Sequence, residues 1–185
     1  MKQAEIAALL PDVMRRTVQP RTPLAALLAV MEALHAPAEQ ALDGIDGTFD
    51  PYRAPDPFVP YLAGWVDLDR LLSTPPAQMD EAALLYLFDG GLGRLRELLA
   101  QAATLSRRRG TAQGLIRFLE TATGVAEFTI SEQVAGEDGQ PRPYHIEIRA
   151  PDAARPFDTL IRRIIELEKP AYVTYDLAYA AAEST

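Results

Sequence analysis

The sequence predicts an α+β fold in which helical segments come first and a small antiparallel sheet, of strand-strand-helix-strand order, comes last. Apolar residues recur at three-and-four spacing through the first two thirds of the chain, and beyond Gly124 they alternate with polar residues. The 185 residues suffice for one compact unit with an attached arm. We expect a helical arm over residues 1–45, a helical region over 46–124 and an α+β subdomain over 125–185.

Two helices are predicted in the arm. The first covers Lys2–Arg16 and is interrupted at Pro11, because proline lacks the backbone N–H that a helix needs. The second begins after Thr22, a capping residue, with Pro23 at the first helical position. Its apolar face is the candidate partner interface and consists of Leu24, Leu27, Leu28 and Met31.

The middle of the chain combines a proline-rich corner with further helices. Pro37 is expected to end or kink the second helix, although the apolar pattern resumes as far as Ile45. Gly, Asp and Pro dominate residues 43–60, which predicts an ordered corner and no long helix. The segment Phe58–Leu68 then predicts a short buried helix that carries Trp65, the only tryptophan.

Two more helices are predicted over Asp80–Phe88 and Leu92–Leu105, separated by a cluster of glycines. In the second of them the spacing of the apolar residues indicates a buried stripe of Leu95, Leu98, Leu99 and Ala102.

The last third of the chain contains the strands. Alternating apolar and polar residues predict strands over 128–131, 144–149 and 172–179, and helical spacing predicts a helix over 157–165 that Pro170 stops. The polar segment between the first two strands is expected to form a long hairpin loop. In this pattern His145 would face solvent.

The run Arg107-Arg108-Arg109 is the densest basic cluster, and two explanations compete for it. A helix corner accounts for it locally: arginines complement the negative end of one helix, Gly110 takes a left-handed conformation and Thr111 caps the next helix. The alternative is an adaptor that binds nucleic acid through these arginines. The net charge of -8 and the absence of nearby aromatic residues favour the helix corner.

No pattern for catalysis, cofactor binding or metal binding occurs. His35 and His145 have no metal-ligand spacing, and His35 is better explained as a core or interface residue. Gly91-x-Gly93 lacks the third glycine of a dinucleotide-binding turn, where Arg96 stands instead. We expect no enzyme, no cofactor and no metal; a small enzyme of unrecognised class is the alternative.

Composition excludes several classes of protein. Without cysteine the chain can form no disulfide and no thiolate metal site. No stretch approaches the roughly 20 apolar residues of a membrane span, and the first ten residues lack the pattern of a signal peptide. We therefore expect no membrane partner and assembly in the bacterial cytoplasm.

Several signatures occur in a fixed order along the chain. They are the corner Asp50-Pro51, the run Leu62-Ala63-Gly64-Trp65, the turn Arg108-Arg109-Gly110-Thr111, the helix Gly114–Leu119 and its end at Thr123-Gly124, and the final EKPAYVTYDL of residues 168–177. Together they resemble the phage tail protein I family, the smaller wedge protein of contractile baseplates. The resemblance covers residues 24–177, and one departure is the glycine break at residues 90–93, where the family more often has a continuous charged helix.

The resemblance implies a structural component of a phage-tail-like particle. Its expected partners are a larger wedge protein related to phage tail protein J, the hub, and sheath or tube-initiating proteins, in a baseplate of six-fold symmetry. The N-terminal helix would pack in a bundle with partner helices. The particle could be a phage, a bacteriocin or an injection system.

Overall fold

A computed structural model describes residues 3–72, 88–136 and 140–180 of the chain. The chain divides into two compact units, Met1–Asp50 (the N-terminal unit) and Pro51–Thr185 (the C-terminal unit). The helix predicted over Asp80–Phe88 lies outside the described residues, apart from Phe88, which is buried. The predicted α+β class is confirmed.

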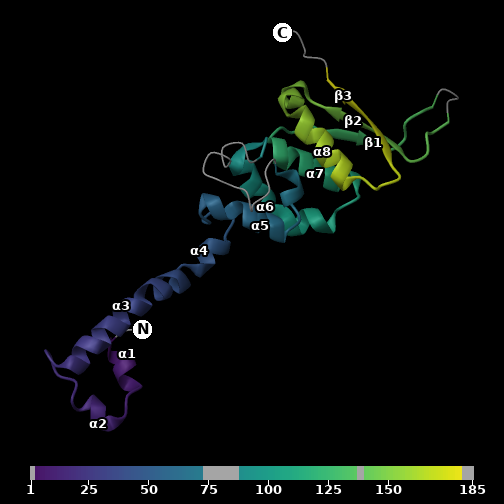
Figure 1. Ribbon diagram of the computed structural model, residues 1–185. Helices are drawn as coiled ribbons and strands as arrows, with labels where there is room; N and C mark the ends of the chain where they lie inside the picture. The colour runs from purple at the N-terminus through teal and green to yellow at the C-terminus, as the bar shows by residue number, and fades with distance from the viewer. Residues whose placement is uncertain (1–2, 73–87, 137–139, 181–185) are drawn as a thin grey trace. The chain divides into compact units, whose positions relative to one another are not determined.

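The described part of the N-terminal unit consists of helices joined by turns and contains no strand (Figure 1). Helices α1 (Gln3–Ala8) and α2 (Asp12–Arg15) precede the long helix α3 (Pro23–Asp43), and the short helix α4 (Ile45–Phe49) follows it. Thr22 caps α3, because its Oγ1 accepts a hydrogen bond from the N–H of Ala25 at 3.3 Å, as predicted. Ile6 of α1 and Leu28 of α3 are the buried apolar residues that hold α1 against α3.

Pro37, which was expected to end or kink the second helix, does not end α3. The helix continues through Pro37 to Asp43. Proline removes the hydrogen bond that its own N–H would make to the carbonyl of Ala33, but the rest of the ladder can remain. The residues around it are mostly alanine, leucine, glutamate and glutamine, which favour helix and keep the segment helical.

In its described residues the C-terminal unit has three longer helices around one core. Helix α5 (Val59–Trp65) lies between two short 3-10 helices, Asp56–Phe58 and Asp69–Leu71. Helices α6 (Gly91–Arg107) and α7 (Ala112–Thr123) are in contact and are joined by a short turn, and α8 (Asp158–Glu168) follows a 3-10 helix at Asp152–Phe157. The predicted stripe of α6 is buried in full: Leu95, Leu98, Leu99 and Ala102.

The sheet has three strands in the order β1 (Thr129–Ser131), β2 (His145–Ala150) and β3 (Thr174–Tyr179). Helices α7 and α8 lie over one face of it (Figure 1). Ile148 of the central strand is fully buried there with Leu119 of α7 and Ile161 of α8. One core therefore spans both the helices and the sheet.

The sheet is mixed, whereas an antiparallel sheet was predicted. Strands β1 and β2 are antiparallel, with Ile130 opposite Ile148, but β2 and β3 are parallel, with Ile148 opposite Leu177. The cause is the connection between them. A helix that crosses from one strand to the next returns the chain to the starting end of the sheet, so the second strand runs in the same direction as the first.

Candidate functional site

The turn between α6 and α7 has the predicted geometry. Gly110 has a φ of 76°, in the region that favours glycine. Oγ1 of Thr111 accepts a hydrogen bond from the N–H of Gly114 at 3.0 Å and donates one to the carbonyl of Arg108 at 2.7 Å. A Cβ added at Gly114 would lie 2.1 Å from that carbonyl oxygen, so the backbone segments touch. The sequence prediction of a helix corner is confirmed.

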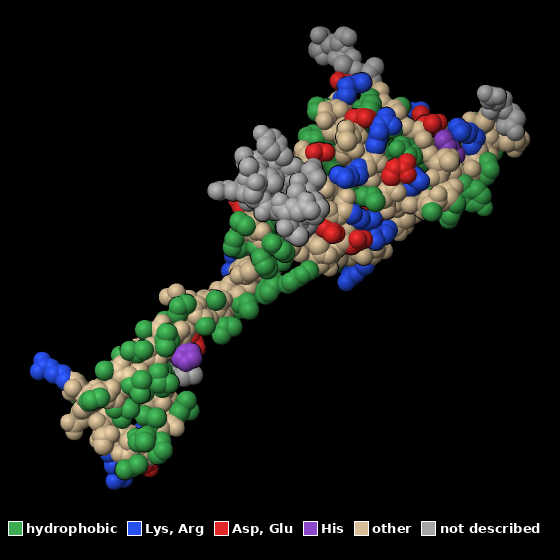
Figure 2. Space-filling view, viewed as in Figure 1, with side chains coloured by type: hydrophobic (Ala, Val, Ile, Leu, Met, Phe, Trp, Pro, Cys, Tyr) green, Lys and Arg blue, Asp and Glu red, His purple; other side chains and the backbone are tan. Residues whose placement is uncertain are grey.

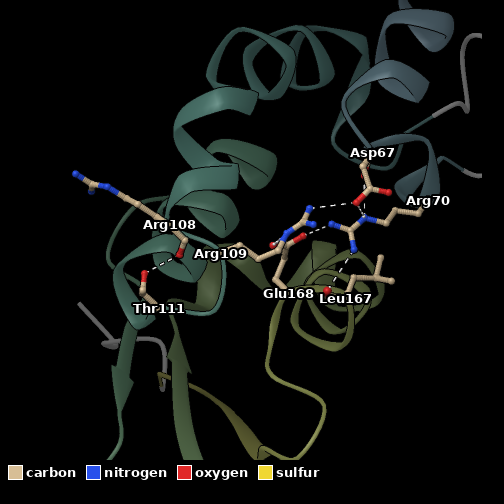
Figure 3. Close-up of polar contacts among 7 residues, drawn as sticks. All are labelled: Asp67, Arg70, Arg108, Arg109, Thr111, Leu167 and Glu168. Carbon is tan, nitrogen blue, oxygen red and sulfur yellow. Dashed lines mark hydrogen bonds and ion pairs between the residues drawn. The ribbon is translucent and has the colours of Figure 1, made fainter.

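Four charged residues meet beside this turn and form what we call the ion-pair corner: Asp67, Arg70, Arg109 and Glu168 (Figure 3). Arg109 reaches Glu168 Oε2 through Nε at 3.2 Å and Asp67 Oδ2 through Nη2 at 3.2 Å. Arg70 pairs with Glu168 Oε1 and donates from Nη1 to the carbonyl of Leu167 at 3.2 Å. The corner thus joins the segment after α5, the α6–α7 turn and the end of α8.

Burial makes Glu168 the central residue of the corner. Its side chain is 7% exposed, whereas those of Arg70 and Arg109 are 22% and 43% exposed. A carboxylate removed from water is costly unless cations and hydrogen bonds compensate it, and two guanidinium groups do so here. The arrangement fixes three segments of the chain relative to one another and leaves no carboxylate oxygen of Glu168 without a cation.

A second arginine binds the proline-rich segment that begins at Pro51. Arg96 of α6 donates hydrogen bonds to the carbonyl oxygens of Pro51 and Ala54, the latter at 2.8 Å, and pairs with Asp56. Its side chain is 15% exposed. Prolines have no backbone N–H, so this segment can form few hydrogen bonds within itself. The guanidinium group of Arg96 instead donates hydrogen bonds to its carbonyl oxygens and holds the segment in place.

Trp65 is exposed, which corrects the prediction of a wholly buried helix. The buried residues of α5 are Val59, Pro60, Leu62 and Ala63, whereas the Trp65 side chain is 68% exposed. Its indole ring stands edge-on to the ring of Phe58, with centroids 6.3 Å apart. The helix has only seven residues, and Trp65 lies on the side away from the core.

His145 was predicted to face solvent, and it is buried instead, at 4% exposure. Its Nδ1 lies 2.8 Å from Thr174 Oγ1 and its Nε2 lies 3.0 Å from Asp176 Oδ2, both on β3. Arg142, in the segment before β2, also reaches Asp176 at 3.4 Å. The side chains of Thr174 and Asp176 on the neighbouring strand therefore help to bury the imidazole ring. His35, by contrast, is exposed, so it is not a core residue, and its alternative interpretation as an interface residue stays a prediction.

One hollow of about 310 Å³ lies between the start of α7, the sheet and the end of α8. Its charged or titratable lining residues include His145, Glu168 and Lys169. Each of them has a structural partner: the β3 side chains, the two arginines of the corner, and Glu166 at 3.2 Å. Among the described residues, no group of three or more acidic or histidine side chains could hold a metal ion. Glu132, Tyr144 and Tyr172 also line the hollow.

The N-terminal unit carries a large apolar surface. Leu34 is 73% exposed, Leu27 56%, Val30 55% and Met31 36%. Apolar side chains gather over this unit in Figure 2. Leu28, at 1% exposure, is already covered within the unit, and Leu24 is half-buried. Such a surface on a small unit is typical of a site that binds another protein.

Comparison with known families identifies the class of protein. Residues 20–172 match the family described as phage tail protein (Tail_P2_I). The chain belongs to this phage tail protein family. No curated protein matches it.

The tail protein therefore has a structural role in a phage tail, and the resemblance drawn from its sequence is confirmed. Its family signatures lie at the turns that shape the C-terminal unit: Asp50-Pro51 is the corner held by Arg96, and Gly124, with a φ of 72°, ends α7. Within the described part of the chain, none of the helices combines the length and apolar character that a bilayer span needs.

Arg70, Arg96 and Glu168 were not recognised from the sequence. Each acts on a residue far away along the chain: Arg70 pairs with a carboxylate 98 positions later and Arg96 with a carbonyl 45 positions earlier. No local pattern marks such pairs. An excess of arginine over lysine was the only available signal, since arginine suits partly buried ion pairs.

Proposed function

We propose that the tail protein is a baseplate wedge subunit of a contractile, phage-tail-like particle, and that it assembles with a larger wedge protein around the hub. The family match supports a tail component, and the exposed apolar face of α3 supports assembly through helices. Packing α3 against a partner would remove this face from water, at about 25 cal/mol for each Å² of apolar surface buried. The role is mechanical.

The C-terminal unit suits a subunit that transmits force. The ion-pair corner and the Arg96 contacts fasten its helices and loops to one another through charge-assisted hydrogen bonds. A part built in this way moves as one body when its neighbours rearrange. In the proposed baseplate, of six-fold symmetry, this unit contacts the hub and the sheath or tube-initiating proteins.

The two alternative functions, a nucleic-acid-binding adaptor and a small enzyme, have less support. Of the Arg107–Arg109 cluster, Arg109 is engaged by Glu168 and Asp67, which leaves two arginines for any phosphate. The larger hollow of the N-terminal unit, about 890 Å³, is lined mainly by alanine and proline, with Arg21 as its charged residue. Neither observation favours a nucleic-acid adaptor or an enzyme.

Co-expression with the larger wedge protein of the same gene cluster tests the proposal. The two proteins should purify together by affinity capture and run together in size-exclusion chromatography. Leu27→Asp should weaken the complex at least tenfold, because it places a carboxylate in an apolar contact. Leu28 is unsuitable for this test, since its burial makes it part of the unit's own fold.

Ala36→Asp is the matched control, because Ala36 is exposed on the side of α3 opposite Leu27 and receives the same charge. Circular dichroism of both variants should match the unchanged protein. If the two wedge proteins run separately, or if both variants co-purify equally well, the proposed interface is wrong.

A further inference from the structure

Strand β3 forms an edge of the sheet, because among the described strands β2 is its one neighbour (Figure 1). The N–H of Thr174 donates to the carbonyl of Tyr144, and the N–H of Ala180 donates to that of Ala150, each at 2.9 Å. Successive residues of a strand direct their backbone groups to opposite sides, so the even-numbered residues of β3 bond to β2. The N–H and C=O groups of its odd-numbered residues therefore face away from the sheet.

These outward backbone groups belong to Tyr175, Leu177 and Tyr179, and within the described part of the chain they have no hydrogen-bond partner. A row of unpaired N–H and C=O groups along a strand is the surface that an additional strand recognises. A helix cannot pair with such a row, since its own backbone groups are already bonded to one another. The edge therefore fits an extended segment.

Two features that commonly protect a sheet edge from such pairing are missing from β3. Its six residues include no proline and no lysine, and all six pair with β2 in one register, so no bulge interrupts the strand. At the other edge of the sheet, β1 has three residues, and a short strand is itself a protection. Strand β3 is thus the edge that can accept a partner.

The side chains of β3 indicate which residues the added strand carries on the side of α8. Tyr175, Leu177 and Tyr179 are half-buried there against the core. The hydroxyl group of Tyr179 donates a hydrogen bond to Asp158 of α8 at 2.7 Å, and Arg155 lies 4.9 Å from the centre of its ring. Apolar side chains of an added strand would extend this half-buried row.

Asp176 is the charged residue of β3 and lies on the opposite face of the sheet. Its side chain is 66% exposed, although Arg142 and His145 contact its Oδ2 at 3.4 and 3.0 Å. A cation on the added strand would complement this carboxylate. A second copy of β3 brings no cation, and two chains of net charge -8 repel each other. These charges favour a basic segment of another protein.

We infer that the free edge of β3 binds an extended, basic segment of another protein, which adds a fourth strand to the sheet. Apolar residues of that segment lie on the side of α8, and a lysine or arginine lies beside Asp176. The inference is independent of the α3 interface, because it concerns the other compact unit.

Hydrogen exchange of the full chain, followed residue by residue by NMR, tests the inference. The probe is a short peptide with blocked ends in which valine alternates with threonine and lysine. In the free chain the amides of Tyr175 and Leu177 should exchange faster than those of Asp176 and Ala178. The peptide should slow the exchange of the first two about tenfold. Amides that are already slow in the free chain, or that the peptide leaves fast, overturn the inference.

Two methylated forms of the peptide separate strand addition from non-specific adhesion. One form carries methyl groups on the backbone nitrogens of the valines, and the other carries them on the remaining backbone nitrogens. In a paired strand only one of these two sets faces β3, so one form should bind and the other should not. Equal binding of both forms contradicts strand addition.

Asp176→Asn tests the role of charge. The unchanged chain should bind the lysine peptide about fivefold more tightly than a peptide with glutamate in place of lysine, and the variant should lose this preference. Glu127→Gln is the matched control, because it removes one negative charge from an exposed residue next to β1, at the other edge. It should keep the preference. If Asp176→Asn keeps it as well, the segment is not selected for its basic charge.

The same measurements identify a different occupant. If exchange at Tyr175 and Leu177 slows as the protein concentration rises without peptide, a second copy occupies the edge and the inference is wrong. The wedge proposal is unaffected by this result, since the assay contains no wedge protein. A chain that binds the peptide but never the larger wedge protein supports the inference and disproves the wedge proposal.

Discussion

Glu168 is the residue that depends most on distant partners. Its carboxylate is buried, and the cations that compensate it come from the segment after α5 and from the α6–α7 turn. Glu168→Gln would remove the charge and leave two guanidinium groups facing each other. We expect a loss of about 1–3 kcal/mol in the free energy of unfolding, measured by urea titration, since both arginines keep some contact with water.

Glu147→Gln provides the comparison for this prediction. Glu147 also pairs with an arginine, Arg149, at 3.0 Å, but the arginine side chain is 68% exposed. Exposed pairs contribute little, so the expected change is below about 0.5 kcal/mol. Equal losses for the two variants would contradict the special role of the ion-pair corner.

Asp158 and Tyr179 give the stability of the C-terminal unit a pH dependence, at acidic pH through the aspartate and at alkaline pH through the tyrosine. Burial, and then the hydrogen bond to Asp158 at 2.7 Å, raise the pKa of Tyr179 to about 12. The hydrogen bond from Arg162 and that from Tyr179 lower the pKa of Asp158. The aspartate therefore stabilises the fold above the usual carboxyl pKa, and this contribution is lost as pH falls through its lowered value.

Tyr179 changes the stability of the fold in the opposite direction with pH. Its pKa is higher in the folded protein than in the unfolded chain, so its contribution is complete below about pH 10 and is lost as pH rises towards about 12. We expect the urea midpoint to fall between about pH 8 and about pH 11. In Tyr179→Phe this fall should be smaller. An identical pH profile would rule out Tyr179 as its source.

At the scale of elements, the α6–α7 corner depends on the absence of a side chain at Gly114. Gly114→Ala would force a Cβ against the carbonyl of Arg108, so helix or turn must shift. We expect a loss of about 1–3 kcal/mol, measured as a lower melting temperature. Gly64→Ala is the control: it also lies in a helix, α5, but nothing stands within 4 Å of its added Cβ. It should be neutral or stabilising by up to about 1 kcal/mol.

Elements governed by neighbouring residues were predictable from the sequence. Thr22 and Thr111 cap helices, Gly110 adopts a positive φ, and α6 buries its apolar stripe, because these features depend on residues within one or two turns. Pro37 was misread since one missing hydrogen bond does not outweigh the helix formers around it. A proline in the sequence does not by itself show whether the neighbouring residues favour helix strongly enough to offset the lost hydrogen bond.

Features that depend on strand pairing were not predictable. His145 is buried because β3 lies parallel beside β2, and no residue near it specifies the direction of β3. The ion-pair corner likewise requires three separate segments to meet. The apolar face of α3 was recognised, but its most buried member, Leu28, turned inward against α1.

At the scale of the whole molecule, the two units should differ in independent stability. The core of the C-terminal unit includes Leu95, Leu119, Ile148 and Ile161, all fully buried, whereas Ile6 and Leu28 are the buried apolar residues of the described N-terminal unit. A fragment of residues 51–185 should therefore unfold cooperatively on heating, as followed by circular dichroism. A fragment of residues 1–50 should show weak helicity and no cooperative transition.

Trp65 is also a natural fluorescent probe of the surface around α5. Because the single indole is 68% exposed, its fluorescence in the isolated chain should peak at long wavelength and respond readily to acrylamide quenching. Any neighbour that settles over α5 during particle assembly would shift the emission to the blue and shield it from the quencher. Assembly on this face can thus be followed in real time without an attached dye.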